Sequence, residues 1–97
     1  MKMRVMVLLG GSEARHFLGN IGRKEDDFIV VHDENEEEYI GAFLEGYGFV
    51  NVHFDKKNVR PLNEEEIATT NKSRLYIGST PMGSLTVDSE GYFPDEE

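Results

Sequence analysis

Two runs of alternating apolar and polar residues follow each other between residues 39 and 62, in the stretch YIGAFLEGYGFVNVHFDKKNVRPL. Alternation with a period of two is typical of β-strands, because successive side chains point to opposite faces of a sheet. Glycines on both sides of Tyr47 permit the positive φ angles of a tight turn. The stretch therefore predicts an antiparallel hairpin of strands over 39–44 and 49–54, followed by a short strand at Val59–Arg60.

Two further β-like runs precede this hairpin, at residues 3–9 and 28–32. Between them, Ser12 follows two glycines and is placed to cap a single helical turn over residues 13–17, so we expect a loop with helical character there. The later connections are shorter than the crossover of about a dozen residues that parallel pairing needs. The fold class that follows is mainly β, as a small antiparallel sheet that curls on itself.

One short helix is expected after the sheet. Asn63 and Glu66 have the spacing of a capping box, and three successive glutamates suit the positive end of a helix dipole. We predict this helix over residues 64–71. A chain of 97 residues can bury one modest core. We therefore expect a single domain over residues 1–97, with a barrel-like core over residues 3–62.

The C-terminal part predicts an added hairpin, which spans residues 74–93. Its strands are expected at residues 74–77 and 85–87, on either side of a turn at Thr80–Gly83. The acidic tail at 94–97 is expected to be frayed.

The glycine, aromatic and valine spacing over residues 28–62 resembles the central strands of SH3-like barrels of the Tudor and KOW kind. In those barrels a strand that begins near a glycine leads through a hairpin to a V-x-V-x-F strand and then to a short final strand. The resemblance implies a small antiparallel SH3-like barrel. For a Tudor-like member it also implies an aromatic cage at the hairpin ends that reads a small ligand or a modified peptide. The aromatic residues available for such a cage are Tyr39, Phe43, Tyr47 and Phe49.

The sequence departs from two branches of that superfamily. It has no ALYDY run and no tryptophan, which argues against the proline-rich peptides that signalling SH3 domains bind. Its charge is opposite in sign to that of KOW-type nucleic-acid binders.

The net charge of -9 comes from one part of the chain. Nine acidic residues and no Lys or Arg lie between residues 25 and 45, and the remaining acidic and basic residues cancel. Such a surface repels nucleic acid and anionic membranes and attracts a basic protein. The predicted partner-binding residues are Glu25, Asp26, Asp27, Asp33, Glu34, Glu36, Glu37, Glu38 and Glu45.

Motifs for catalysis and metal binding are missing from the sequence. His32 is followed directly by Asp33, and His53 stands two residues before Asp55, but no third ligand is specified, and we interpret both as ordinary strand residues. The acidic loop after His32 has Glu38 and Leu44 where a calcium-binding EF-hand requires glycine and glutamate. The LLGGSEA segment lacks the lysine of a phosphate-binding loop and is interpreted as a turn. We therefore predict no catalytic residue, no metal site and no cofactor.

These observations favour a non-enzymatic interaction protein that docks on a basic partner surface. A sharper form of the hypothesis is that the acids imitate nucleic acid, as small inhibitors from phages and mobile elements do, which makes the partner a protein that binds nucleic acid. The alternatives are the aromatic reader at the Tyr47 hairpin, a structural subunit that pairs an exposed strand such as Leu75–Ile77 with another chain, and, least favoured, an enzyme that uses His32 and His53. The lack of cysteine and of a long apolar N-terminal run leads us to expect a cytoplasmic protein without a membrane segment.

Overall fold

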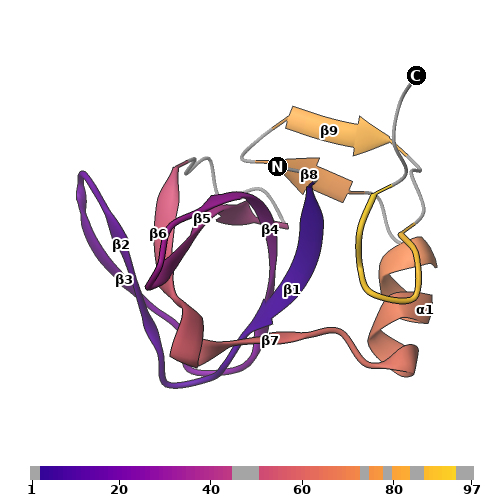
Figure 1. Ribbon diagram of the computed structural model, residues 1–97, viewed down its shortest axis with the longest axis horizontal. Coiled ribbons are helices and arrows are strands. Elements are labelled where there is room, and N and C mark those ends of the chain that lie inside the picture. The colour runs from indigo at the N-terminus through magenta and orange to yellow at the C-terminus, as the bar shows by residue number, and fades with distance from the viewer. Residues whose placement is uncertain (1–2, 45–50, 73–74, 78–79, 84–86, 94–97) are drawn as a thin grey trace.

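The computed structural model describes residues 3–44, 51–72, 75–77, 80–83 and 87–93. The chain is mainly β, as predicted, with one seven-stranded antiparallel sheet of strand order β3-β2-β6-β5-β4-β1-β7 and one short helix (Figure 1). The sheet strands are β1 Arg4–Leu8, β2 Glu13–His16, β3 Gly19–Gly22, β4 Asp27–Glu34, β5 Glu38–Phe43, β6 Val52–Asp55 and β7 Val59–Pro61. The remaining elements are the 3-10 turn η1 Lys56–Asn58, the helix α1 Glu64–Lys72, and a separate two-stranded sheet of β8 Leu75–Ile77 and β9 Thr80–Gly83.

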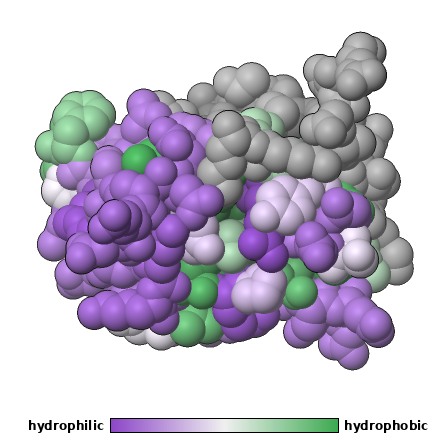
Figure 2. All heavy atoms as spheres, viewed as in Figure 1, coloured by the Kyte–Doolittle hydropathy of each residue, from purple (hydrophilic) through white to green (hydrophobic). Residues whose placement is uncertain are grey.

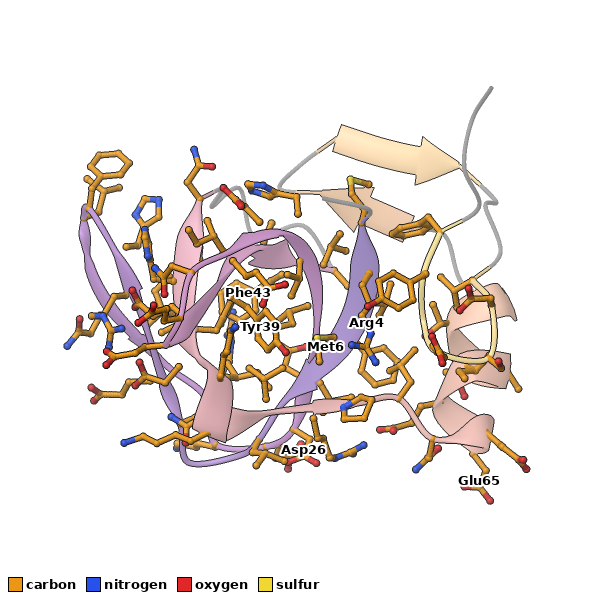
Figure 3. All side chains as sticks on the ribbon, viewed as in Figure 1. Arg4, Met6, Asp26, Tyr39, Phe43 and Glu65 are labelled. Atoms are coloured by element: carbon orange, nitrogen blue, oxygen red, sulfur yellow. The ribbon has the colours of Figure 1, made fainter. Side chains whose placement is uncertain are left out.

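The sheet is open and strongly curled, so that β1, β4, β5 and β6 surround a common interior (Figure 1). Alternate side chains of these strands point into this interior, where Phe43 and Phe54 meet edge to face at 5.5 Å between ring centroids. Figure 3 shows Met6, Tyr39 and Phe43 inside the curl, whereas the Arg4 guanidinium of β1 lies 4.7 Å from the centre of the Tyr92 ring. The interior cluster consists of Met6, Leu8, Ala14, Ile29, Val31, Phe43, Val52 and Phe54.

A second apolar cluster covers the outer face of β1 and β4. Val5 and Val7 of β1 are fully buried there, so the first strand is covered on both faces. The covering residues come from beyond the sheet, with Leu62 before α1, Ile67 within it, and Phe93 near the C-terminus. The chain therefore builds two small cores on the two faces of one sheet.

The predicted hairpin between residues 39 and 54 is present as β5 and β6, which pair antiparallel with Tyr39 opposite Phe54. Val52 and Phe54 are buried while Asn51 is exposed, which confirms the predicted alternation. The strand begins at Val52, later than predicted, because Asn51 has a φ of 56° and leaves the extended conformation. The predicted turn around Tyr47 lies outside the described residues.

The segment that we expected to be a loop with a helical turn is a β-hairpin, so that prediction was wrong. Ser12 does not cap a helix, because the residues that follow it form β2, and its own carbonyl oxygen accepts a hydrogen bond from the Arg23 N–H at 3.0 Å. β2 pairs with β6, and Ala14 becomes fully buried in the interior cluster. Burial of Ala14 and the sheet pairing outweigh the weak local preference for a helical turn.

The predicted capping box at the start of α1 is confirmed. The backbone N–H of Glu66 donates to Asn63 Oδ1 at 2.8 Å, and the backbone N–H of Asn63 donates to Glu66 Oε1 at 2.9 Å. The helix ends at Lys72, one residue beyond the prediction. No helix in the described ranges is long and apolar enough to cross a membrane.

The C-terminal hairpin differs from the prediction. Thr80–Gly83, expected to be a turn, is strand β9 and pairs antiparallel with β8. Residues 87–93 instead return to β1, where the Val5 N–H donates to the Gly91 carbonyl oxygen at 2.7 Å and the Phe93 N–H donates to the Met3 carbonyl oxygen at 3.0 Å. Burial of Val87 and Phe93 over the outer face decides this path.

Candidate functional site

The turn between β4 and β5 is the most charged part of the candidate site, and hydrogen bonds of its backbone N–H groups hold its shape. Asn35 Oδ1 accepts hydrogen bonds from the N–H groups of Glu37 and Glu38 at 3.0 and 2.8 Å. The Asn35 N–H donates to the Glu38 carbonyl oxygen at 2.9 Å. The carboxylates of this turn are therefore presented on a fixed backbone.

Three carboxylates at this turn, one of them at the end of β4, point to solvent. Asp33, Glu36 and Glu37 are exposed, and they form no ion pair within the described part of the chain. Glu34 differs from them, because its carboxylate accepts a hydrogen bond from Lys56 Nζ at 2.6 Å. The group of Asp33, Glu36 and Glu37 is called the acidic turn below.

Beside the acidic turn, Arg15 links three strands on the outer face of the sheet. Its guanidinium donates to Asp55 Oδ1 at 2.8 Å and is ion-paired with Glu38 of β5. This hydrogen bond from Arg15 lowers the pKa of Asp55, against a smaller opposing effect of burial. His53 Nδ1 lies 3.5 Å from Glu38 Oε1. A depression next to this cluster is lined by Glu37, Asp55 and Lys57.

The first three acids of the predicted docking surface lie elsewhere. Asp26 and Asp27 stand at the start of β4, and Asp33 lies six residues along the strand, about 20 Å away in extended chain. Asp26 accepts the Gly10 N–H at 2.7 Å and lies 3.3 Å from Arg60, and both contacts lower its pKa. Asp27 is ion-paired with Arg23 at 3.2 Å. Glu25 is exposed at the same end, and Glu45 lies outside the described residues.

The structure describes two of the four residues predicted for an aromatic cage, Phe43 and Tyr39. Phe43 is fully buried in the interior cluster, and the Arg23 guanidinium covers its ring at 4.0 Å. Tyr39 packs against the same cluster with Lys56 Nζ 5.1 Å from its ring centroid. Tyr47 and Phe49 lie outside the described residues. The Phe43 ring therefore has no face open to a ligand.

The two histidines considered for chemistry are half-buried strand residues. His32 lies at the bulge where the β4–β5 register shifts, and His53 lies on β6 beside Glu38. Within the described ranges no group of three or more His, Asp or Glu side chains is arranged to hold a metal ion.

Sequence reasoning missed the most exposed apolar residues of the described chain. Phe17 and Leu18 form the turn between β2 and β3 and are 87% and 72% exposed. The His16 ring lies 4.4 Å from the Phe17 ring, and its Nδ1 accepts the Leu18 N–H at 3.2 Å. Figure 2 shows apolar atoms at this hairpin tip, at the edge of a hydrophilic surface formed by β2, β3, β5 and β6. The sequence signal for this hairpin was the pair of short runs at residues 13–16 and 19–22, on either side of Phe17 and Leu18. We missed it because we interpreted residues 13–17 as a helical turn.

Comparisons with protein-family models, with curated proteins and with solved structures find no match to this chain.

Proposed function

We propose that this chain is a non-enzymatic interaction protein that docks on a basic partner surface through the acidic turn. The observation that carries the proposal is the arrangement of Asp33, Glu36 and Glu37, which are exposed on a hydrogen-bonded turn and have no internal ion pair among the described residues. Their neighbours Glu34 and Glu38 are already ion-paired with Lys56 and Arg15. The three free carboxylates are therefore the groups that a basic partner would neutralise.

The proposal includes membership of the SH3-like barrel superfamily. The predicted order of a glycine-containing strand, a strand that ends the V-x-V-x-F pattern and a short last strand is consistent with β5, β6 and β7, where β6 contains the Val52–Phe54 part of that pattern. After the turn η1, β7 pairs antiparallel with β1, the first strand of the chain. The strands β1, β4, β5 and β6 curl around one interior (Figure 1). This arrangement supports a small barrel with an extra hairpin, β2–β3, inserted after its first strand.

Nucleic-acid imitation is the sharper form of the same proposal. Fixed carboxylates at short spacing offer a basic cleft the negative charge that phosphates would supply. A disordered acidic tail would lose conformational entropy on binding, and this loss would weaken its affinity. The partner is then a protein that binds DNA or RNA, and this chain competes with the nucleic acid for it.

The experiment that tests the proposal compares two variants with the same net charge. One carries Glu36→Lys and Glu37→Lys in the acidic turn, and the control carries Glu25→Lys and Glu64→Lys at exposed positions away from it. Glu38 is left intact, because its ion pair with Arg15 belongs to the fold. Each tagged protein is used for capture from a lysate of its source, and the affinity of the purified captured protein is then measured at increasing salt.

We expect the turn variant to lose the partner and the control to retain most of the affinity. The affinity of the unmodified chain should fall steeply as the Debye length shrinks from about 10 Å to about 3 Å between 0.1 and 1 M salt. Equal losses in the two variants would show that net charge matters and the acidic turn does not. Unchanged binding of the turn variant would contradict the proposal. Displacement of the chain by DNA or RNA tests the imitation of nucleic acid separately.

A further inference from the structure

The strand β3 is an edge of the seven-stranded sheet. Its residues Gly19 to Gly22 carry no charge and no proline, and three of the four are exposed. The opposite edge, β7, contains Pro61 and is followed closely by α1. Charged side chains and prolines are the usual means by which proteins prevent an edge strand from pairing with another chain. Only the β7 edge has such protection within the described sheet.

The hydrogen bonds of the hairpin show which backbone groups of β3 face outward. Arg23 uses both of its backbone groups toward β2, because its N–H donates to the Ser12 carbonyl oxygen and its carbonyl oxygen accepts the Gly11 N–H at 2.7 Å. Backbone groups alternate in direction along an antiparallel strand. Ile21 therefore also faces β2, whereas the N–H and C=O groups of Asn20 and Gly22 point away from the sheet.

The two faces next to this edge differ in chemistry. Ile21 points to the interior side, where it packs against the interior cluster opposite Ala14. On the outer side, Asn20 Nδ2 lies 3.5 Å from Oε2 of the exposed Glu13. The cluster of Arg15, Glu38 and Asp55 lies next to Glu13 on the same side of the sheet. This outer side carries three acidic residues and one basic residue. The exposed Leu18 lies at the end of the same edge.

We propose that β3 binds an extended segment of the partner in which apolar and basic side chains alternate. Backbone pairing at Asn20 and Gly22 would place the apolar side chains of this segment beside Ile21, and its basic side chains beside Glu13. This inference rests on the proposed function, because it takes the partner to be basic. It adds that the partner contributes a strand to the sheet, a common mode of peptide recognition.

The test uses a synthetic probe, an acetylated and amidated hexapeptide of alternating lysine and valine. Two modified probes carry N-methyl groups on the lysine amides only or on the valine amides only, which leaves the charge and side chains unchanged. Binding to the full chain is followed by proton–nitrogen NMR at low salt. We expect the unmodified probe to shift the amide signals of Asn20 and Gly22 and to slow their exchange with solvent.

The methylated probes should then behave differently from each other. In an antiparallel added strand, the residues that hydrogen-bond to Asn20 and Gly22 lie directly opposite them on the same face, so the lysine amides face β3. In a parallel added strand, the hydrogen bonds go to the neighbours of those residues, so the valine amides face β3. One methylated probe should therefore bind about tenfold more weakly, as expected for the loss of one or two backbone hydrogen bonds, and the other should bind as the unmodified peptide does. Equal binding of the two methylated probes, whether retained or lost, would overturn the proposal.

Two variants separate this inference from the docking of the acidic turn. Asn20→Pro removes an outward N–H that β2 does not use, and it should abolish binding at β3 while the unfolding midpoint shows that the protein remains folded. Glu36→Lys with Glu37→Lys should leave the shifts at Asn20 and Gly22 in place. Probe-induced shifts confined to residues 33–37 would overturn strand addition and leave the acidic turn supported. Shifts at Asn20 and Gly22 that depend on protein concentration without any probe would show that a second copy is the occupant.

Discussion

Gly41 of β5 lies so close to Val30 of β4 that a side chain on residue 41 has no room. A Cβ atom added there would overlap the Val30 carbonyl oxygen and lie 2.8 Å from its carbonyl carbon. Both atoms belong to backbone that is fixed by the β4–β5 ladder, so they cannot move aside cheaply. The glycine that the sequence placed in this strand is therefore required by the close approach of two strands.

The first prediction follows from this contact. Gly41→Ala should lower the free energy of unfolding by about 2 to 3 kcal/mol, since it forces overpacking against rigid backbone. Gly22→Ala is the matched control, because an added Cβ at residue 22 meets nothing within 4 Å. Its effect should remain within about 0.5 kcal/mol. Urea unfolding of both variants checks the pair, and similar stabilities would show that the sheet can open at Gly41 without cost.

The second prediction compares two phenylalanines. Phe54 is fully buried against Phe43, whereas Phe17 is 87% exposed at the hairpin tip. Phe54→Ala should cost about 3 to 5 kcal/mol, from lost burial and the cavity that remains. Phe17→Ala should change the stability by no more than about 0.5 kcal/mol. Thermal unfolding measures both, and a large loss in the Phe17 variant would mean that the hairpin tip contributes to the core.

Acid should weaken an ion pair that joins α1 to the sheet, which is the third prediction. Glu66 Oε1 lies 2.6 Å from Arg60 Nη1, and this hydrogen bond, with a smaller one from the Asn63 N–H, lowers the pKa of Glu66 below its ordinary value of 4.5. A carboxylate whose pKa is lowered in the folded state stabilises that state at pH values above the ordinary pKa of the group. This stabilisation is lost as the pH falls through the lowered pKa. The free energy of unfolding should therefore decrease as the pH falls below about 5.

A charge-neutral variant identifies the group responsible. Glu66→Gln should be less stable at pH 7 and should lose less stability between pH 5 and pH 3 than the unmodified chain. Glu64→Gln, at an exposed position two residues earlier, should keep the original pH dependence. Urea unfolding across this pH range provides the measurement. A pH profile of Glu66→Gln identical to that of the unmodified chain would assign the acid sensitivity to other carboxylates, such as Asp26 and Asp55.

The sequence predicted the elements whose signals are local. The alternation around Val52 and Phe54 and the capping box of Asn63 with Glu66 each lie within a few residues, and both are confirmed. The hairpin β2–β3 was missed because each strand has four residues and its buried face contributes only Ala14 and Ile21. Pairing with β6 stabilises it, and that pairing is not visible in its own residues.

The charged surface shows the same limit. A cluster of acids in the sequence indicates where charge is concentrated but cannot indicate which carboxylates are already paired. Asp26 meets Arg60, which lies 34 residues away, and Glu38 meets Arg15, which lies 23 residues away. These long-range pairs depend on strand order. The acidic turn could therefore be separated from the structural carboxylates only once the sheet was known.

The last prediction concerns residues 87–93, which cover the outer face of the sheet. Phe93 is 4% exposed in the outer cluster, and its N–H donates to the Met3 carbonyl oxygen. Phe93→Ala should cost about 3 kcal/mol, and it should speed hydrogen exchange at the Val5 amide, which donates to the Gly91 carbonyl oxygen. Ser89→Ala, at an exposed position in the same segment, should change neither quantity. Because the Val5 amide reports on this contact directly, unchanged exchange in the Phe93 variant would show that the segment is not part of the outer core.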